Sequence, residues 1–198
     1  YHVGIHYYDI ETGKFTHYYE HNVKGLGGLK NYIACDDGRG NLYVGHDGKG
    51  MSVISLKDHT IKRYQHVSDD PDSLPGRLVV ALCVDEQRNI WVGTNKGLSI
   101  FNPATEKFTT FRHIPGDENS LLSNQVLDIK QMRDGRLWIC TNMGGVSILD
   151  MQQNAFTSPT HIHFQNIPAT NDVHGLSGPN ARCAFQDSFG NIWLGNCL

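Results

Sequence analysis

The sequence predicts an all-β protein, a β-propeller of four-stranded antiparallel blades. Three observations predict this fold: an internal repeat of about 47 residues, four short apolar segments in each repeat, and no stretch with sustained 3.6-residue periodicity. Glycine supplies 21 of the 198 residues, about one in nine against an average of about 7%. Frequent tight turns between short strands are therefore expected.

Two independent markers define the repeat. The first is an aromatic residue within an apolar segment, at steps of 48, 47 and 55 residues: Tyr43, Trp91, Trp138 and Trp193. The second is a glycine that opens an apolar segment, at steps of 46, 47 and 48 residues: Gly4, Gly50, Gly97 and Gly145. Because both markers keep one register, the repeat predicts stacked copies of one structural unit.

Each repeat is predicted to contain four strands, A to D. Strand A is an apolar run such as 79–84, closed by an acid at Asp37, Asp85 and Asp187, whereas Met132 interrupts this pattern. A short turn leads to strand B, which carries the aromatic marker, and Asp-Gly at 134–135 is a hairpin sequence. Strand C begins at the second marker. Strand D is expected around the apolar residue eleven positions further on: Phe15, Ile61, Phe108 and Phe156.

These strands make about four blades' worth of propeller within one domain, 1–198. The predicted units are a half blade at 1–20, blades at 26–66, 74–112 and 121–165, and a half blade at 178–198. The two halves could close a four-bladed ring, or the chain could be a slice of a longer array, since propellers have about 4 to 8 blades. Because Leu198 directly follows a strand, the slice is favoured, and Tyr1 suggests a processed chain or a fragment.

The aromatic markers have a packing interpretation. A lone four-stranded sheet cannot bury both of its faces, whereas blades arranged radially bury each face against a neighbour. Strand B then needs bulk on both sides, which Trp91 supplies on one side and Ile90 with Val92 on the other. We therefore interpret the tryptophans as contacts between blades and not as platforms for a ligand.

Composition excludes several classes of function. The net charge is −3 and the basic residues are scattered, which argues against a nucleic-acid partner. The longest apolar run, 78–84, is far shorter than the roughly 18 residues of a membrane helix, so this segment is expected to make no membrane contact. The five cysteines are odd in number and lack a Cys-x-x-Cys pair, so they predict neither a zinc site nor a disulfide framework.

A candidate binding surface follows from the strand order. In antiparallel blades the D–A and B–C loops emerge on one face, and the D–A loops are long: 66–77, 113–124 and 165–181. Loops on a rigid scaffold often carry function. The predicted ligand-binding residues on this face are polar: His46, Asp47, Arg77, Asn95, Lys96, Asn124, Asn142 and Arg182. Amides, a guanidinium and an aromatic platform would suit a sugar. The alternative is that these Asn, Asp and Gly residues only form turns.

Other polar patterns favour structure over chemistry. Asp-Ser-Leu at 72–74 and Asn-Ser-Leu at 119–121 are interpreted as loops closed by their own side chains, with the leucine inserted into the blade. His161 and His163 could face one side of a strand, but no third ligand is evident. Carboxylates are plentiful, but no pair is marked out by its spacing for general acid–base chemistry, and no Gly-x-Ser-x-Gly elbow appears. The sequence thus predicts no metal, no cofactor and no catalytic residue.

Three phrases carry a family resemblance: Asp-x-x-Gly-Asn-Ile-Trp-Leu-Gly at 187–195, Gly-Leu-Ser-Ile-Phe-Asn-Pro-x-Thr-x-x-Phe at 97–108, and Asn-Ser-Leu-Leu-Ser-Asn-Gln-Val at 119–126. The sequence resembles the two-component regulator propeller repeat over nearly its whole length. Tyr43 in place of tryptophan, Cys140 in place of glycine, and the step of 55 residues depart from the pattern.

The resemblance implies a function. It implies part of a seven-bladed propeller in the periplasmic sensor region of a hybrid two-component system, a homodimeric, membrane-anchored histidine kinase that regulates glycan utilisation. This chain would then be a non-enzymatic, ligand-sensing segment that meets neighbouring blades of its parent and binds an oligosaccharide. Two alternatives remain open: a propeller enzyme acting on polysaccharide, as a lyase or glycosidase, and a structural or protein-binding propeller.

Overall fold

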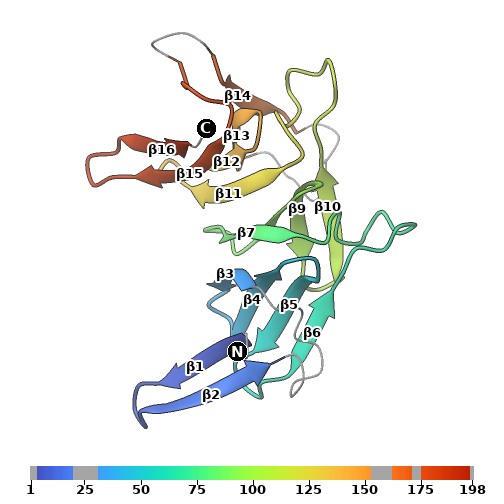
Figure 1. The fold of residues 1–198 in the computed structure, drawn as a ribbon, viewed down its shortest axis with the longest axis vertical. Helices are drawn as coiled ribbons and strands as arrows, with labels where there is room; N and C mark the ends of the chain where they lie inside the picture. The colour runs from blue at the N-terminus through green and yellow to red at the C-terminus, as the bar shows by residue number, and fades with distance from the viewer. Residues whose placement is uncertain (1–3, 20–30, 153–161, 171–174, 197–198) are drawn as a thin grey trace.

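The chain forms an arc of antiparallel β-sheets (Figure 1). The computed structural model describes residues 4–19, 31–152, 162–170 and 175–196. Three four-stranded sheets, which we call the first, second and third blades, are flanked by a two-stranded half-blade at each end. The described residues contain no helix, and hence no helix long and apolar enough to cross a membrane. The predicted all-β propeller of four-stranded blades is confirmed.

Each blade is a simple antiparallel meander in which the strands follow chain order. The N-terminal half-blade consists of β1 (Gly4–Asp9) and β2 (Lys14–Tyr19). The first blade consists of β3 (Asn31–Asp36), β4 (Asn41–His46), β5 (Gly50–Ser55) and β6 (Ile61–Tyr64). The second consists of β7 (Val79–Val84), β8 (Ile90–Thr94), β9 (Gly97–Asn102) and β10 (Lys107–Phe111). The third consists of β11 (Val126–Gln131), β12 (Leu137–Thr141), β13 (Gly145–Leu149) and β14 (Phe164–Pro168). The C-terminal half-blade consists of β15 (Ala181–Gln186) and β16 (Ile192–Asn196).

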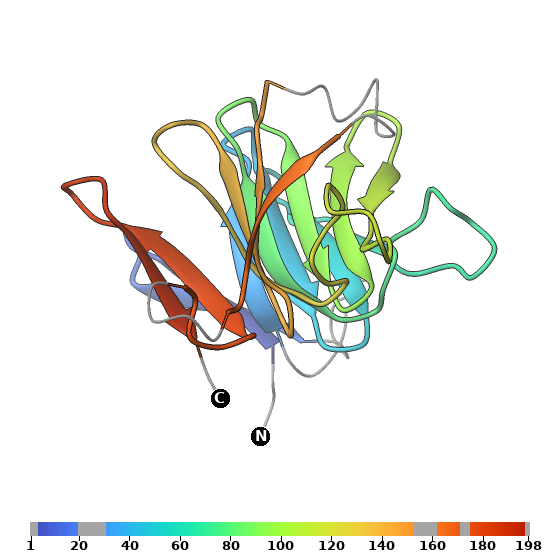
Figure 2. The same ribbon diagram turned by 90° about the horizontal axis from the view of Figure 1, so that it is seen from above.

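The arc is open. The A strands β3, β7, β11 and β15 lie along its concave side, and the D strands lie outside (Figure 1). The two half-blades lie at opposite ends of the arc and form separate sheets. Viewed from above, the sheets of consecutive blades lie side by side (Figure 2). Of the two expected arrangements, the structure therefore shows the open array and not a ring closed within the chain.

Blades hold together through apolar faces. Trp91 of the second blade is fully buried and belongs to one cluster with Ile129 and Ile139 of the third. Tyr43 of the first blade is likewise buried, in a cluster with Leu82 and Val92 of the second. The interpretation of these aromatic residues as contacts between blades is therefore confirmed. Trp193, on the C-terminal half-blade, is the exposed member of the set.

One predicted strand is misplaced in the third blade. Strand D was expected around Phe156, but β14 begins at Phe164, which pairs with Leu149 as Phe108 pairs with Phe101. The eight residues that lengthen the last repeat therefore lie in the connection between β13 and β14. Phe156 lies outside the described residues, and Gln165, expected in the following loop, belongs to β14.

The acid at the end of strand A organises the A–B turns of the first blade, the second blade and the C-terminal half-blade. In the second blade, Asp85 accepts hydrogen bonds from the backbone and side-chain nitrogens of Asn89, both at 2.8 Å, and from Trp91 Nε1 at 2.8 Å. In the C-terminal half-blade, Asp187 accepts the equivalent bonds from Asn191 and from Trp193 Nε1. The bonds from Trp193 and Asn191 lower the pKa of Asp187 to about 2. One carboxylate thus fixes both the turn and the indole.

The third blade lacks this carboxylate. Met132 occupies the position of Asp85, and Arg136 occupies that of Asn89. As a result Trp138 Nε1 is buried without a hydrogen-bond partner. A buried unpaired donor costs about 1–3 kcal/mol, so this turn is a local weakness in the arc.

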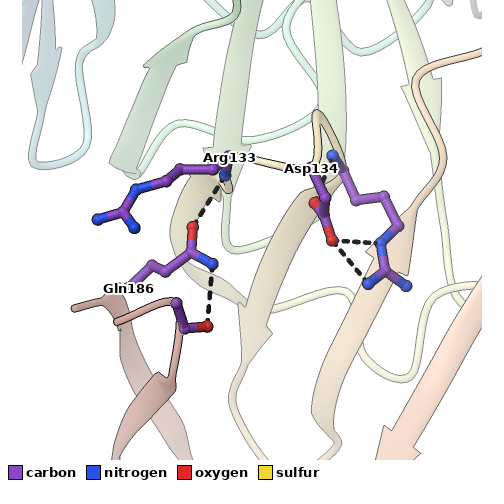
Figure 3. A network of polar contacts seen from close by, with 5 residues as sticks. Arg133, Asp134 and Gln186 are labelled. Carbon is purple, nitrogen blue, oxygen red and sulfur yellow. Dashed lines mark hydrogen bonds and ion pairs between the residues drawn. The ribbon is translucent and has the colours of Figure 1, made fainter. Parts of the chain in front are cut away.

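Polar bridges also join consecutive blades at these turns. Gln186 Oε1 accepts from Arg133 N at 2.9 Å, while Gln186 Nε2 donates to Gly190 O within its own turn (Figure 3). Gln131 repeats both bonds one seam earlier, accepting from Glu86 N and donating to Gly135 O. Each glutamine therefore closes its own turn and holds the preceding blade.

We predict that restoring the missing carboxylate stabilises the third blade. In M132D/R136N, the aspartate would accept bonds from the new asparagine and from Trp138 Nε1, raising the free energy of unfolding by about 1 kcal/mol. R136N alone is the control, because it removes only the exposed Arg136–Asp134 pair, worth at most about 1 kcal/mol. Urea denaturation would measure the difference, and a double variant less stable than R136N would contradict this account.

Candidate functional site

The first two D–A loops repeat one compact structure. In the loop after the second blade, His113 Nδ1 donates to Leu121 O at 2.7 Å, and Ser120 Oγ accepts from Ile114 N and donates to Asp117 O. The preceding loop repeats these bonds with His66, Leu74, Ser73, Val67 and Asp70. We call residues 66–74 and 113–121 the clamps.

Each clamp covers the outer edge of the next blade. Asp72 O accepts from Phe108 N on β10, and Asn119 O accepts from Phe164 N on β14, both at 2.8 Å. An uncovered D strand would present unpaired backbone groups that invite association with other strands. Leu74 and Leu121, the last residues of the two clamps, are fully buried. The structural interpretation of the Asx-Ser-Leu segments is thus confirmed for the serine and the leucine, whereas the Asp72 side chain pairs with Lys107 of the second blade.

His46 belongs to the blade interior and not to the exposed loop face. It ends β4, is fully buried, and its Nε2 lies 2.8 Å from Ser52 Oγ. Burial lowers its pKa to about 4, with a smaller effect of Arg63. Thr94 and Thr141 occupy the same position in the next two blades and bond to Gly97 O and Gly145 O. His46 therefore replaces a structural threonine.

Three of the predicted asparagines are engaged in loop structure. Asn124 Oδ1 accepts from His113 N at 2.8 Å, and Asn142 Nδ2 donates to Gln125 Oε1 at 2.7 Å. Asn95 lies against Gly76, where a Cβ atom would come within 2.5 Å of Asn95 Oδ1. That oxygen is buried without a hydrogen-bond partner. Asn124 and Asn142 thus bond to groups of neighbouring loops, and the ligand-binding role of the three asparagines stays a prediction.

The charged residues of the predicted set are exposed. Asp47, Arg77, Lys96 and Arg182 all present their side chains on the surface. Lys96 adjoins Gly76, the residue before Arg77, so Arg77 and Lys96 lie near each other. Gly50 N donates to Arg77 O, which places the B–C loop of the first blade beside them. Asp47 precedes Gly50 on the same B–C loop, so Asp47, Arg77 and Lys96 gather at the seam between the first and second blades. This group is one exposed part of the predicted site.

Two cavities lie outside the predicted set. One, of about 580 Å³, lies between the second clamp and β14 and is lined by His113, Glu118, Phe164 and Asn166 among others. Another, of about 490 Å³, lies between the first and second blades beside Tyr43, Tyr64 and Phe101. The clamp repeats after 47 residues, from His66 to His113, so the sequence could have indicated the cavity beside the second clamp.

Metal and thiol chemistry find little support in the described part of the chain. No three His, Cys, Asp or Glu side chains come together there as a ligand set, and His161 lies outside it. Cys35, Cys83, Cys140 and Cys183 are free thiols. Burial raises the pKa of Cys35 and of Cys140 to about 12, which disfavours the reactive thiolate.

We predict that His46 makes stability depend on pH. Because its folded pKa is about 4 and its unfolded pKa about 6.5, the unfolded chain binds the proton first. Stability contributed by neutral His46 is complete above about pH 6.5 and is lost as pH falls toward 4, by up to about 3 kcal/mol. H46T should flatten this part of the profile, measured by urea denaturation from pH 4 to 7. Equal slopes for both proteins would contradict the assignment.

We also predict that Ser120 holds the second clamp. S120A should leave Ile114 N without its acceptor and lower the free energy of unfolding by about 1–2 kcal/mol. Amide exchange should accelerate at Ile114 and at Phe164, whose partner Asn119 belongs to the clamp. The control is S123A, because Ser123 lies outside the clamp and its Oγ accepts a weak 3.3 Å bond from Gln125 N. Unchanged exchange in S120A would show that the clamp does not depend on this serine.

Comparison with known proteins shows which proteins this chain resembles in sequence and fold. The family model described as two component regulator propeller matches residues 73–96. The extracellular domain described as that of hybrid two-component system BT3049 from B. thetaiotaomicron is 40% identical, with a TM-score of 0.77 over 99% of this chain and 23% of that chain. The extracellular domain of BT4673 from the same organism is 19% identical, with a TM-score of 0.74 over 98% of this chain and 24% of that one.

A more distant structure shares only the fold. Catalytically inactive virginiamycin B lyase from Staphylococcus aureus, solved with quinupristin, is 14% identical, with a TM-score of 0.59 over 94% of this chain and 54% of that chain. The comparison with curated proteins found no match. This chain spans about a quarter of the two-component domains that it resembles. The matched model, the repeat that extends it along the arc, and the identity to the BT3049 domain together show that the chain belongs to the two-component regulator propellers.

Proposed function

We propose that this chain is a ligand-sensing segment of the extracytoplasmic region of a hybrid two-component sensor histidine kinase that regulates glycan utilisation. The observation that carries the proposal is the 40% identity over 99% of the chain to the extracellular domain of BT3049. A domain outside the cytoplasm that belongs to a signalling system has the task of detecting an external ligand. A periplasmic location and a membrane-anchored parent are part of the proposal.

The ligand proposed is an oligosaccharide bound at the seam between the first and second blades. Arg77 and Lys96 supply exposed donors, and Asp47 supplies acceptors, to one region of the loop face. Sugar hydroxyl groups donate and accept at once, so they suit a site of mixed polarity on a rigid scaffold. A ligand that binds one domain arrangement better than another would shift the population of the signalling state.

The other proposed partners follow from the architecture of the relatives. Because those domains are about four times longer than this chain, neighbouring blades of a longer parent are proposed to meet the arc. A homodimeric parent sensor is proposed as well. Neither a nucleic acid nor a membrane is proposed as a partner of this segment, whose net charge is −3.

A propeller enzyme is the competing function. A general acid at neutral pH needs a carboxyl group whose pKa is raised. Among the described residues, the carboxyl groups with a shifted pKa all have it lowered, mainly through turn hydrogen bonds, as in Asp58, Asp134 and Asp187. This electrostatic pattern supports a binding role over a hydrolytic one. The likeness to the lyase, at 14% identity, shows the fold alone.

Calorimetric titration tests the proposal. A panel of neutral and acidic oligosaccharides should include at least one that binds, and R77A or K96A should weaken that binding about fivefold or more, or about 1 kcal/mol. K57A is the matched control, since Lys57 is an exposed cation on the opposite turns. If no sugar of the panel binds, or if R77A and K96A bind as tightly as K57A, the proposed site is wrong.

A further inference from the structure

The contact between the first and second blades, which we call the first seam, holds a cavity whose walls both belong to four-stranded blades. Its volume of about 490 Å³ lies in the range of about 300–1,000 Å³ typical of ligand pockets. β4, β5 and β6 build one wall, and Phe101 and Pro103 of the second blade build the other. The polar lining lies near the A–B and C–D turns, at the end of the seam opposite the loop face: Asn41, Ser55, Thr60 and Lys62.

The side chains on the first-blade wall are smaller than those at the same positions of the second blade. Tyr43 pairs with Val53 across β4 and β5, as Trp91 pairs with Ile100 across β8 and β9. The first blade therefore carries a side chain of less volume at both positions. Because Tyr43 and Trp91 are 1% and 0% exposed, this difference in volume falls inside the seam and not on the surface.

Two apolar side chains close the corresponding place between the second and third blades, which we call the second seam. Met151 and Ile162 pack there against the apolar cluster that contains Trp91. By strand register, their positions in the second blade carry Pro103 and Glu106. A rigid ring and a carboxylate thus stand at the first seam where two apolar side chains fill the second.

Three aromatic rings form the floor of the cavity. The Phe101 ring meets the Tyr64 ring edge-to-face, with 4.8 Å between centroids, and meets the Tyr43 ring at 6.2 Å in the same manner. Phe101 and Tyr43 are each 1% exposed, whereas Tyr64 is partly exposed. Aromatic pairs of this geometry stabilise one another. The floor is therefore ordered before any ligand arrives, which lowers the cost of binding.

An ion pair lies at the rim of the cavity. Lys62 Nζ donates to Glu106 Oε1 across the seam and lies 5.6 Å from the centre of the Tyr64 ring. An ammonium group has three donors and a carboxylate accepts about four hydrogen bonds, so both groups keep capacity after pairing. Asn41 Nδ2 donates to Asp37 Oδ2 at 2.8 Å, so the Asn41 oxygen is the acceptor that this side chain can offer a ligand.

We propose that this cavity binds one neutral sugar ring, a pyranose. A pyranose has an apolar C–H face, which would lie on the Tyr64 ring, and a rim of hydroxyl groups that donate and accept at once. These hydroxyl groups would bond to Lys62 and Glu106. The ring should be neutral, because Lys62 and Glu106 already neutralise each other. The proposal does not rest on the loop-face site, which lies at the other end of the same seam.

An NMR titration of the intact chain tests for binding. The probes are the methyl glycosides of glucose, galactose, mannose and xylose. At least one should shift the amide signals of β5 and β6 in a saturable manner with a millimolar dissociation constant, as expected for a ligand of about a dozen non-hydrogen atoms. If none of the four does so, the proposal is wrong.

A cavity-filling variant tests the position of the sugar. Y43W/V53I should weaken binding at least tenfold and remain folded, because Trp91 and Ile100 are accommodated at the same positions of the second blade. I54V is the matched control, since Ile54 is buried on β5 with its side chain on the opposite face of the sheet, and it should bind as the wild type does. Binding that Y43W/V53I leaves unchanged would overturn the proposal.

Two further results would also overturn it, and both leave the loop-face proposal to its own test. Glycoside-induced shifts confined to residues 47–50 and 76–77 would place the sugar on the loop face and not in the cavity. Phenol is the second probe. If phenol shifts the signals of β5 and β6 and no glycoside does, the cavity selects flat apolar rings and not sugars.

Discussion

The architecture depends on one constraint: every blade is apolar on both faces and must be covered twice. Trp91 and Trp193 show the consequence, because they have the same strand position and the same bond to an aspartate, yet only Trp91 is buried. The neighbouring sheet, and not the residue or its local turn, decides burial. Stability in such an array is therefore a sum of blade and seam contributions.

Polar groups join consecutive blades at two places, the A–B turns and the outer D strands. On the turn side, Gln131 and Gln186 each accept a backbone bond from the preceding blade. On the outer side, each clamp supplies a carbonyl oxygen to the next D strand. Edge protection and blade coupling are thus carried out by the same loop. Because each of these contacts joins consecutive blades only, further repeats could be added without any new kind of contact.

The sequence predicts the local part of this structure well and the long-range part poorly. Strands, turns and the packing role of Trp91 follow from alternation and period, since each depends on neighbouring residues. The position of strand D in the third blade was mistaken, because a period cannot show where eight additional residues lie, and Phe164 takes the place expected for Phe156. His46 was mistaken for a loop residue, because the repeat does not show that the strand extends to this residue and that its ring is buried beside Ser52. The path of the clamps depends on bonds between blades, which no local pattern encodes.

Departures from the repeat are the natural place to look for specificity. Residues that fit the repeat, such as Asp85, Asn89 and Ser120, are engaged in turns and clamps. Buried departures, such as Met132 and His46, change stability and leave the surface unaltered. Arg77 and Lys96 are neither repeated nor buried, and they adjoin one seam. A ligand that bridges two blades there would add to the seam contribution that the array needs, so recognition and the mechanical coupling of blades would be linked at one place.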